Sequence, residues 1–238
     1  MALAGEVLAI YGTDGAYLDF TLLQSEVRCE QECLAALEVE ERRLRRQVVR
    51  PLYRQIHPSR HLETLAGVGE ASAAVYASFM GVAKRFPSMR ACRGWSGLVP
   101  NSKQSSNQET KGLHITQAGP NLIKKFAYLD AEVARLHDPQ IAAIYHDQMV
   151  HKGKHYNQAI CTCATHLLDR VRAVLYDDKP YELRDVDGTP LTAEQARTII
   201  AERYTVPEEV RRRNTKQQRR QRTDQLAERK TQRESRPS

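Results

Sequence analysis

Residues 61–81 read HLETLAGVGEASAAVYASFMG. Gly67 and Gly69 stand between an apolar segment that includes Leu62 and Leu65 and an alanine-rich run. Two glycines allow the backbone to turn sharply and leave the first N–H groups of the next helix open to an anion. The pattern predicts a helix-hairpin-helix, which holds a nucleic-acid phosphate without reading the bases. An ordinary turn between two helices has the same pattern, and this alternative stays open.

The segment before this hairpin, residues 21–55, has the pattern of one long helix. Apolar residues recur at alternating spacings of four and three, and the other positions are largely charged, as in EVEERRLRRQ at 38–47. This heptad spacing predicts a coiled-coil-like arm that Pro58 ends. Its apolar seam packs either against a second subunit, which would make a homo-oligomer, or against the body of the same chain. The seam consists of Leu23, Val27, Leu34, Leu37, Leu44 and Val48.

The sequence after the hairpin predicts further helices and has no strong strand pattern. Apolar stripes at helical spacing cover residues 122–136 and 156–176. Asp138 followed by a proline is typical of a helix start, and Thr192 with Gln195 forms a capping box. We therefore predict a mainly α fold, with a long helical arm followed by a compact helical domain that carries the hairpin and a polar loop.

Three parts follow one another along the chain in this prediction. Residues 1–58 form the N-terminal segment and the heptad arm, residues 59–180 the compact domain, and residues 181–238 a linker, a short helix and a basic tail. Residues 207–238 contain eleven Lys and Arg against five Asp and Glu, so this tail carries +6 of the net charge of +7. A basic tail favours a polyanionic partner, because each neutralised phosphate releases a counterion. A solvated end that keeps the protein soluble is the alternative.

Composition excludes several classes of protein. No run approaches the roughly 20 apolar residues that cross a bilayer, and the N-terminus lacks the basic start of a signal peptide. Five cysteines are an odd number without framework spacing, which fits a reducing cytoplasm. Cys161 and Cys163 lie two apart on a predicted helix and point away from each other, and the histidines show no ligand spacing. We expect no metal or cofactor to be bound by this chain.

The most polar segment lies at the centre of the chain, where residues 99–120 read VPNSKQSSNQETKGLHITQAGP. Ser105 and Ser106 are accompanied by three basic or titratable side chains. A serine becomes a nucleophile only beside a base or in a strongly cationic pocket, and sequence does not show spatial neighbours. The segment is either a surface loop without a role or the place where chemistry occurs. The accompanying side chains are Lys103, Lys111 and His114.

Five motifs occur in one order between residues 62 and 120. They are Gly67-Val68-Gly69, Arg85-Phe86, the run from Trp95 to Pro100, Gln104-Ser105, and the run from Gly112 to Gly119. Together they resemble the C-terminal domain of the IS110/IS116 insertion-sequence transposases, which are recombinases guided by a structured RNA. The resemblance covers roughly residues 60–180, and a helical arm before them is also typical of the family.

The resemblance implies an activity and a site. The serine of the Gln-Ser motif is the family's nucleophile, so Ser105 would attack a DNA phosphodiester from the polar loop, which would then be catalytic. Ser106 is the fallback nucleophile. Cations must stabilise the charged transition state, and Arg85, Lys103 and Lys111 are the candidates. The implied partners are DNA and a structured guide RNA, and the implied location is the bacterial cytoplasm at the nucleoid. The implied DNA-binding residues are Gly67, Gly69, Arg85, Lys103, Gln104, Lys111 and His114.

Departures from the family pattern leave a second function open. Ser106 replaces a glycine, Gln117 stands where lysine is usual, and Ile123-Lys124 replaces Leu-Arg. The family also carries an N-terminal ribonuclease-H-like domain whose four carboxylates hold divalent metal, expected to be Mg²⁺, and we expect this chain to lack it. The alternative is therefore a truncated, non-catalytic nucleic-acid-binding or assembly protein derived from such a transposase.

Overall fold

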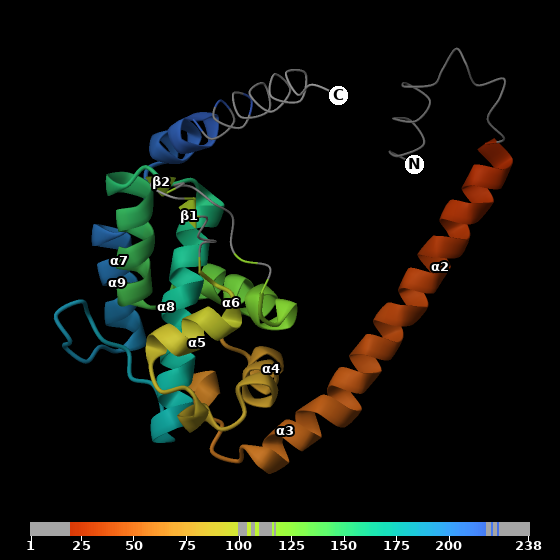
Figure 1. Cartoon of the computed structure of the whole chain (residues 1–238), viewed down its shortest axis with the longest axis horizontal. Helices are drawn as coiled ribbons and strands as arrows, with labels where there is room; N and C mark the ends of the chain where they lie inside the picture. The colour runs from red at the N-terminus through yellow and green to blue at the C-terminus, as the bar shows by residue number, and fades with distance from the viewer. Residues whose placement is uncertain are drawn as a thin grey trace. The chain divides into compact units, whose positions relative to one another are not determined.

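A computed structural model describes residues 20–99, 104–105, 108–109, 116, 118–217, 220 and 223. This part of the chain is mainly helical, as predicted, with a long N-terminal helix followed by a compact helical region (Figure 1). The elements are α2 (Phe20–Leu44), η2 (Arg45–Val49), α3 (Arg50–Ile56), η3 (His61–Thr64), α4 (Glu70–Met80), η4 (Ala83–Arg85), α5 (Met89–Ser96), β1 (Gln104–Ser105), β2 (Gln108–Glu109), α6 (Asn121–Ala134), α7 (Pro139–His146), η5 (Asp147–His151), α8 (Tyr156–Asp177) and α9 (Ala193–Arg203). A further helix covers 208–217.

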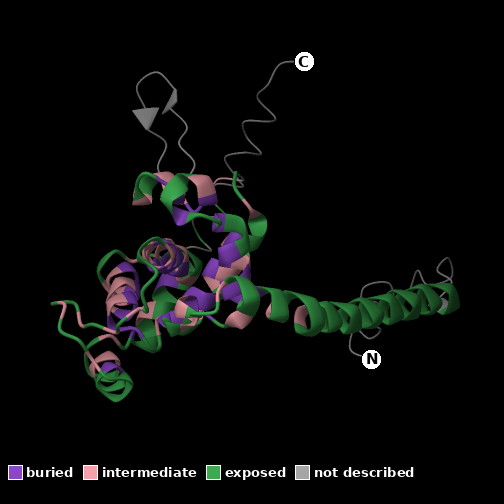
Figure 2. Ribbon diagram, turned by 90° about the horizontal axis from the view of Figure 1, so that it is seen from below, coloured by how far each residue is buried: buried purple, intermediate pink, exposed green. Residues whose placement is uncertain are grey.

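Contacts divide the chain into two units, residues 1–51 and 52–238. In the first unit, α2 is a 25-residue helix whose described side chains are all exposed, as Figure 2 shows in green. Pairs three and four residues apart, Glu40 with Arg43 and Glu41 with Arg45, lie on its surface. The apolar seam is exposed on this helix, with Leu34 60% and Leu37 66% exposed. Association through the seam stays a prediction.

A proline lies close to the end of the arm, yet the helical backbone continues through it. The π-helix η2 precedes Pro51, and α3 carries the helix on to Ile56. A proline has no N–H to donate to the turn before it, and a wider turn is one way for a helix to adapt to that loss. The expected end of the arm before Pro58 is confirmed.

The second unit is built around α8, a 22-residue helix against which α4, α5, α6 and α7 pack. In Figure 1 this helix (teal) runs through the middle of the compact region. Its buried face follows the apolar stripe read from the sequence, and Cys163, Leu167 and Val171 are at most 1% exposed. Burial raises the pKa of the Cys163 thiol to about 12, so this cysteine is an inert core residue.

Helix starts in this unit follow the capping signals of the sequence. The Asp138 carboxylate accepts hydrogen bonds from the N–H groups of Gln140 and Ile141, at 2.9 and 3.2 Å. Thr192 and Gln195 form the predicted capping box of α9, which packs against α7. Among the described helices, none is both long and apolar enough to cross a bilayer.

Candidate nucleic-acid and serine site

The two ends of the polar segment meet between the end of α5 and the start of α6. The Thr116 N–H donates to the Val99 carbonyl at 3.1 Å, and its hydroxyl donates to the Gly97 carbonyl at 3.4 Å. The Thr165 hydroxyl on α8 donates to the Leu98 carbonyl at 3.1 Å. The segment that contains the two serines therefore leaves and re-enters the helical body at one place.

Gly97 is required at this junction for two reasons. It has a φ of +72°, and a Cβ built there would lie 1.9 Å from the Ala118 carbonyl oxygen. Gly119 also lies close to the segment that ends α5, because a Cβ built there would lie 2.4 Å from the Trp95 carbonyl oxygen. Glycines of two sequence motifs that are 22 positions apart thus fit against each other's backbone.

Lys124 holds the same junction from α6. Its amino group donates to the carbonyl oxygens of Ala118 at 3.0 Å and of Thr116 at 3.4 Å. No local pattern predicts a role for this lysine, which was singled out only because it replaces a family arginine. Its position in the sequence could have indicated this role, because Lys124 lies four residues after Pro120, one helical turn into α6.

Ser105 and Gln104 lie in β1, which pairs antiparallel with β2. Ser105 stands opposite Gln108, and Gln104 opposite Glu109. These two-residue strands did not show in the sequence pattern. Lys103, Ser106, Lys111 and His114 lie outside the described residues, so the assignments of nucleophile, cations and DNA contacts in this segment stay predictions.

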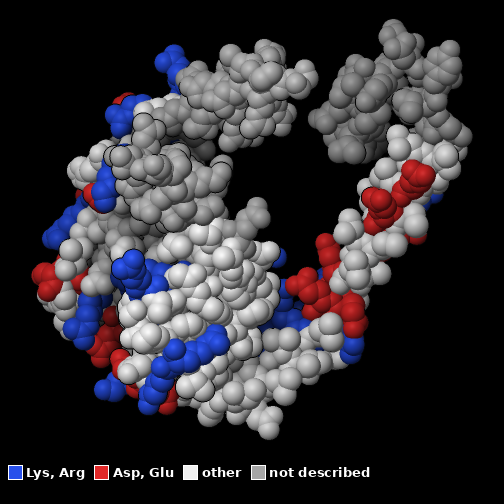
Figure 3. All heavy atoms as spheres, viewed as in Figure 1, with Lys and Arg blue, Asp and Glu red and all other residues white. Residues whose placement is uncertain are grey.

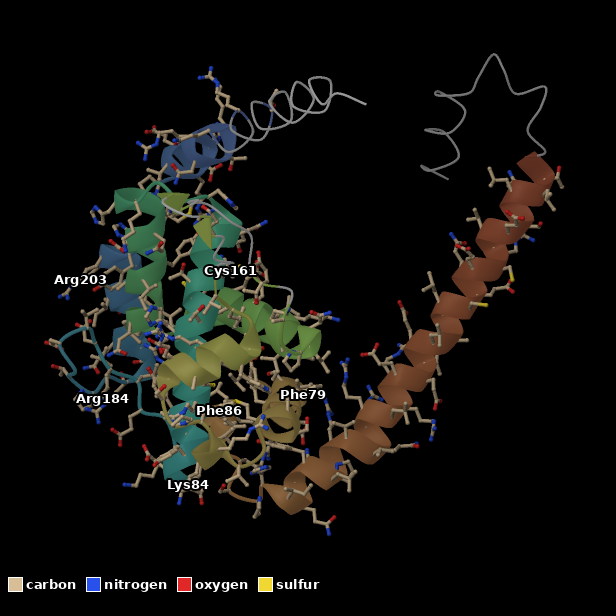
Figure 4. All side chains as sticks on the ribbon, viewed as in Figure 1. Phe79, Lys84, Phe86, Cys161, Arg184 and Arg203 are labelled. Atoms are coloured by element: carbon tan, nitrogen blue, oxygen red, sulfur yellow. The ribbon has the colours of Figure 1, made fainter. Side chains whose placement is uncertain are left out.

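Arg85, the candidate cation on the body, lies at the end of η4 over two aromatic rings. Its guanidinium carbon is 4.6 Å from the Phe86 ring centre and 5.0 Å from that of Trp95, and it donates to the Phe79 carbonyl at 2.9 Å. Phe79, in the last turn of α4, and Phe86, in the connection from α4 to α5, are labelled in Figure 4. The side chain remains exposed, so the stack fixes its position while donors stay accessible to a phosphate.

Gly67 packs the turn between η3 and α4 tightly against α6. Its φ is +87°, and a Cβ there would lie 2.3 Å from the Asp130 carbonyl oxygen. Before it, the expected first helix is the four-residue 3-10 helix η3. Gly69 is the N-cap of α4 in an extended conformation, and its N–H donates to the Ser72 hydroxyl at 3.0 Å.

A carboxylate already lies at the start of α4. Glu70 occupies the first turn and accepts a hydrogen bond from Arg54 at 2.6 Å. Negative charge in a first turn complements the helix dipole, and it would repel a phosphate approaching the same N–H groups. Phosphate binding by Gly67 and Gly69 stays a prediction. A phosphate bound there would lie close to the Glu70 carboxylate.

A buried acid lies where α4 packs against α6. The Tyr76 hydroxyl on α4 donates to Asp130 Oδ2 on α6 at 2.7 Å, and both side chains are buried. Burial raises the pKa of Asp130 to about 6, against the opposing hydrogen bonds from Tyr76 and Ser72. Burial likewise raises the pKa of Tyr76 well above its ordinary value. The acid carries its proton more readily than an exposed aspartate, which reduces the cost of enclosing it.

Within the described ranges, no three His, Cys, Asp or Glu side chains converge on a point that could hold a metal ion.

Residues 59–146 match a family model described as Transposase IS116/IS110/IS902 family. The chain is also similar to the insertion element IS110 uncharacterized 43.6 kDa protein of Streptomyces coelicolor, with 30% identity over 161 residues. The aligned region is 67% of this chain and 39% of the relative, so the chain spans about two fifths of that protein's length. The family match includes the turn with Gly67 and Gly69, the Arg85 stack and the junction of the polar segment.

Proposed function

Because this chain belongs to the IS116/IS110/IS902 transposase family over residues 59–146, we propose that it acts in DNA transposition, with Ser105 as the nucleophile of strand transfer. The observation that carries the proposal is the junction of the polar segment. There the glycines of two family motifs fit together and fix both ends of the segment that contains Ser105. A nucleophile on a loop needs such a rigid base to be placed against its substrate.

The proposed reaction exchanges one phosphoester bond for another. The Ser105 hydroxyl oxygen forms a bond to phosphorus as the bond from phosphorus to one deoxyribose oxygen breaks, and the serine proton passes to the released hydroxyl. The phosphoserine ester retains the energy of the broken bond. A second DNA hydroxyl can therefore reverse the step and free the serine without a nucleoside triphosphate.

Charge at phosphorus has to be stabilised during both steps, and this chain offers cations for that role. Arg85 is held by its aromatic stack, and we assign Lys103 and Lys111 to the same task. Gln104, His114, Gly67 and Gly69 complete the proposed DNA contacts. The family also implies divalent metal held by carboxylates, but no such group occurs among the described residues and no step here uses it.

Trapping on a suicide DNA substrate tests the assignment. Ser105→Ala should abolish the covalent protein–DNA adduct, whereas the matched control Ser106→Ala should retain it, and peptide mapping should find the modified residue at 105. An adduct of unchanged yield from Ser105→Ala would overturn the assignment, and loss only with Ser106→Ala would move the nucleophile by one residue.

A second candidate function is non-catalytic binding or assembly. It is favoured by Ser106 and Gln117, which stand where the family has a glycine and a lysine. We propose under either function that DNA is a partner, that a structured guide RNA is bound, and that chains associate through the seam of α2. Adduct formation separates the two candidates, because only the first requires it.

A further inference from the structure

The beginning of the basic tail is docked on the compact unit. In the helix 208–217, Asn214 is only 2% exposed, and its amide nitrogen donates to the carbonyl oxygens of Met149 at 2.8 Å and Lys154 at 2.9 Å. Val206 is buried just before this helix, and Val210 packs against the core. This helix is therefore placed by tertiary contacts, although the sequence suggested only a charged tail.

Asn214 completes the end of the π-helix η5. After η5 the chain turns back, so the Lys152 N–H donates to the Asp147 carbonyl at 3.0 Å and the Lys154 N–H to the Gln148 carbonyl at 2.8 Å. The Met149 carbonyl is next in this series, and Asn214 supplies its donor. A buried carbonyl at a helix end is costly without a partner, so this side chain fixes the helix 208–217 to the loop 152–154.

Basic side chains lie on both sides of this contact. We define the basic surface as Lys152, Lys154, Arg211, Arg212, Arg213 and Lys216, all of them exposed. Figure 3 shows Lys and Arg side chains over the 208–217 helix, at the upper left of the view.

Two of these six cations form ion pairs with carboxylates. Asp147 pairs with Lys152 at 2.6 Å, and Glu208 pairs with Arg212 at 3.2 Å. Glu209 is a further carboxylate of the helix 208–217. Within the part of the chain that the structure describes, no acidic side chain lies within ion-pair distance of the other four cations. The surface therefore keeps a net positive charge. The four cations are Lys154, Arg211, Arg213 and Lys216.

The docking fixes where the helical cations point. Val210 and Asn214 form the face against the body, and successive residues turn by about 100°. Arg211 and Arg213 thus flank the docked face on its two sides, and Asn214 donates to the Lys154 carbonyl of the loop 152–154. Two segments about 60 positions apart, each carrying basic residues, are therefore in direct contact.

We propose that this basic surface binds the phosphodiester backbone of a nucleic acid, and that Asn214 is a positioning residue for it. The surface is made by residues outside the serine segment and would position the chain along its substrate. Backbone contacts of this kind fix register and carry affinity without reading sequence. The inference rests on the proposed function for the identity of the partner.

Binding by the full chain, followed by fluorescence anisotropy at several salt concentrations, tests the surface. Lys154→Gln and Arg213→Gln should each weaken binding several-fold and reduce the slope of log affinity against log salt by about one. Arg184→Gln removes the same charge from another part of the body, labelled in Figure 4, and should change neither quantity. Equal effects of all three substitutions, or none, would overturn the proposal.

Duplex DNA and duplex RNA of one sequence serve as separate probes. Loss of affinity for either duplex in the Lys154→Gln and Arg213→Gln variants supports backbone binding. The duplex that shows the loss identifies the nucleic acid that is bound. This assay reads binding and not adduct formation, so it can fail while Ser105 still reacts, or succeed if Ser105 does not.

Asn214→Ala tests the positioning role because it removes no charge. Affinity should fall several-fold, and Lys154→Gln should cost less in this background than in the wild-type chain, since the two cationic segments no longer act together. Thermal unfolding of the variants checks that the core is retained. Unchanged affinity of Asn214→Ala, or fully additive effects of the two substitutions, would contradict the role given to Asn214.

Discussion

Gly67 and Gly69 look equivalent in the sequence, and the structure separates their roles. Gly67 has a positive φ and lies against the backbone of α6, where a side chain has no space. Gly69 has an extended backbone and open space around its Cα. The first glycine is therefore required by packing, and the second is the one whose surroundings leave room for a ligand.

Gly67→Ala should destabilise the protein by about 2–4 kcal/mol, because the left-handed backbone and the collision with the Asp130 carbonyl both disfavour the folded state. Urea unfolding measures the change. Gly69→Ala is the matched control and should cost no more than about 1 kcal/mol, the ordinary loss at a helix N-cap. Equal losses of unfolding free energy at the two positions would contradict the role given to the close approach at Gly67.

Asp130 should make the stability of the fold depend on pH. Its pKa is raised to about 6 in the folded chain from an ordinary value of 3.8, so the folded state binds the proton more tightly than the unfolded state. The stabilisation is fully present below about pH 4 and is lost as pH rises through about 6. Asp130→Asn, which keeps an acceptor for Tyr76, should remove this dependence.

The difference in melting temperature between Asp130→Asn and the wild-type chain measures the effect of this acid alone. That comparison matters because burial lowers the pKa of His146, His155 and His166, whose contributions change in the opposite direction as pH rises. The variant should gain stability relative to wild type between pH 4.5 and 7.5. A difference that stays constant over this range would contradict the assignment.

At the scale of elements, α2 is a helix whose polar face is stabilised by local ion pairs while its apolar seam is exposed. Isolated helices derive little stability from such pairs, and burial of an apolar face usually contributes most. A seam with heptad spacing on so long a helix is suited to pairing with the same seam of a second chain.

Leu34→Glu combined with Leu37→Glu should shift the protein from an oligomer to a monomer, because the introduced carboxylates would face each other across the seam. Sedimentation or light scattering gives the mass. Val39→Glu is the control, since Val39 is 59% exposed on the same helix but lies off the seam. A wild-type chain that is already monomeric at micromolar concentration would remove the prediction, as would dissociation by Val39→Glu.

At the scale of the whole molecule, much of the fold could be predicted from local pattern. Short stretches predict the end of the arm, the N-cap Asp138 and the capping box at Thr192, and each is present. The contacts at the base of the polar segment could not be read in this way. Lys124 binds carbonyls across a turn, and Thr165 reaches the Leu98 carbonyl from 67 residues away.

Local pattern alone predicts the helical class, the order of the family motifs and the location of the excess positive charge. Spacing, capping and charge are local properties, so a single chain displays them without its fold. The fit of Gly97 against Gly119, and the contact by which Asn214 holds the helix 208–217 to the Lys154 carbonyl, become visible only in the folded chain. These contacts join backbone groups far apart along the chain, and no local pattern specifies which donor will meet which carbonyl.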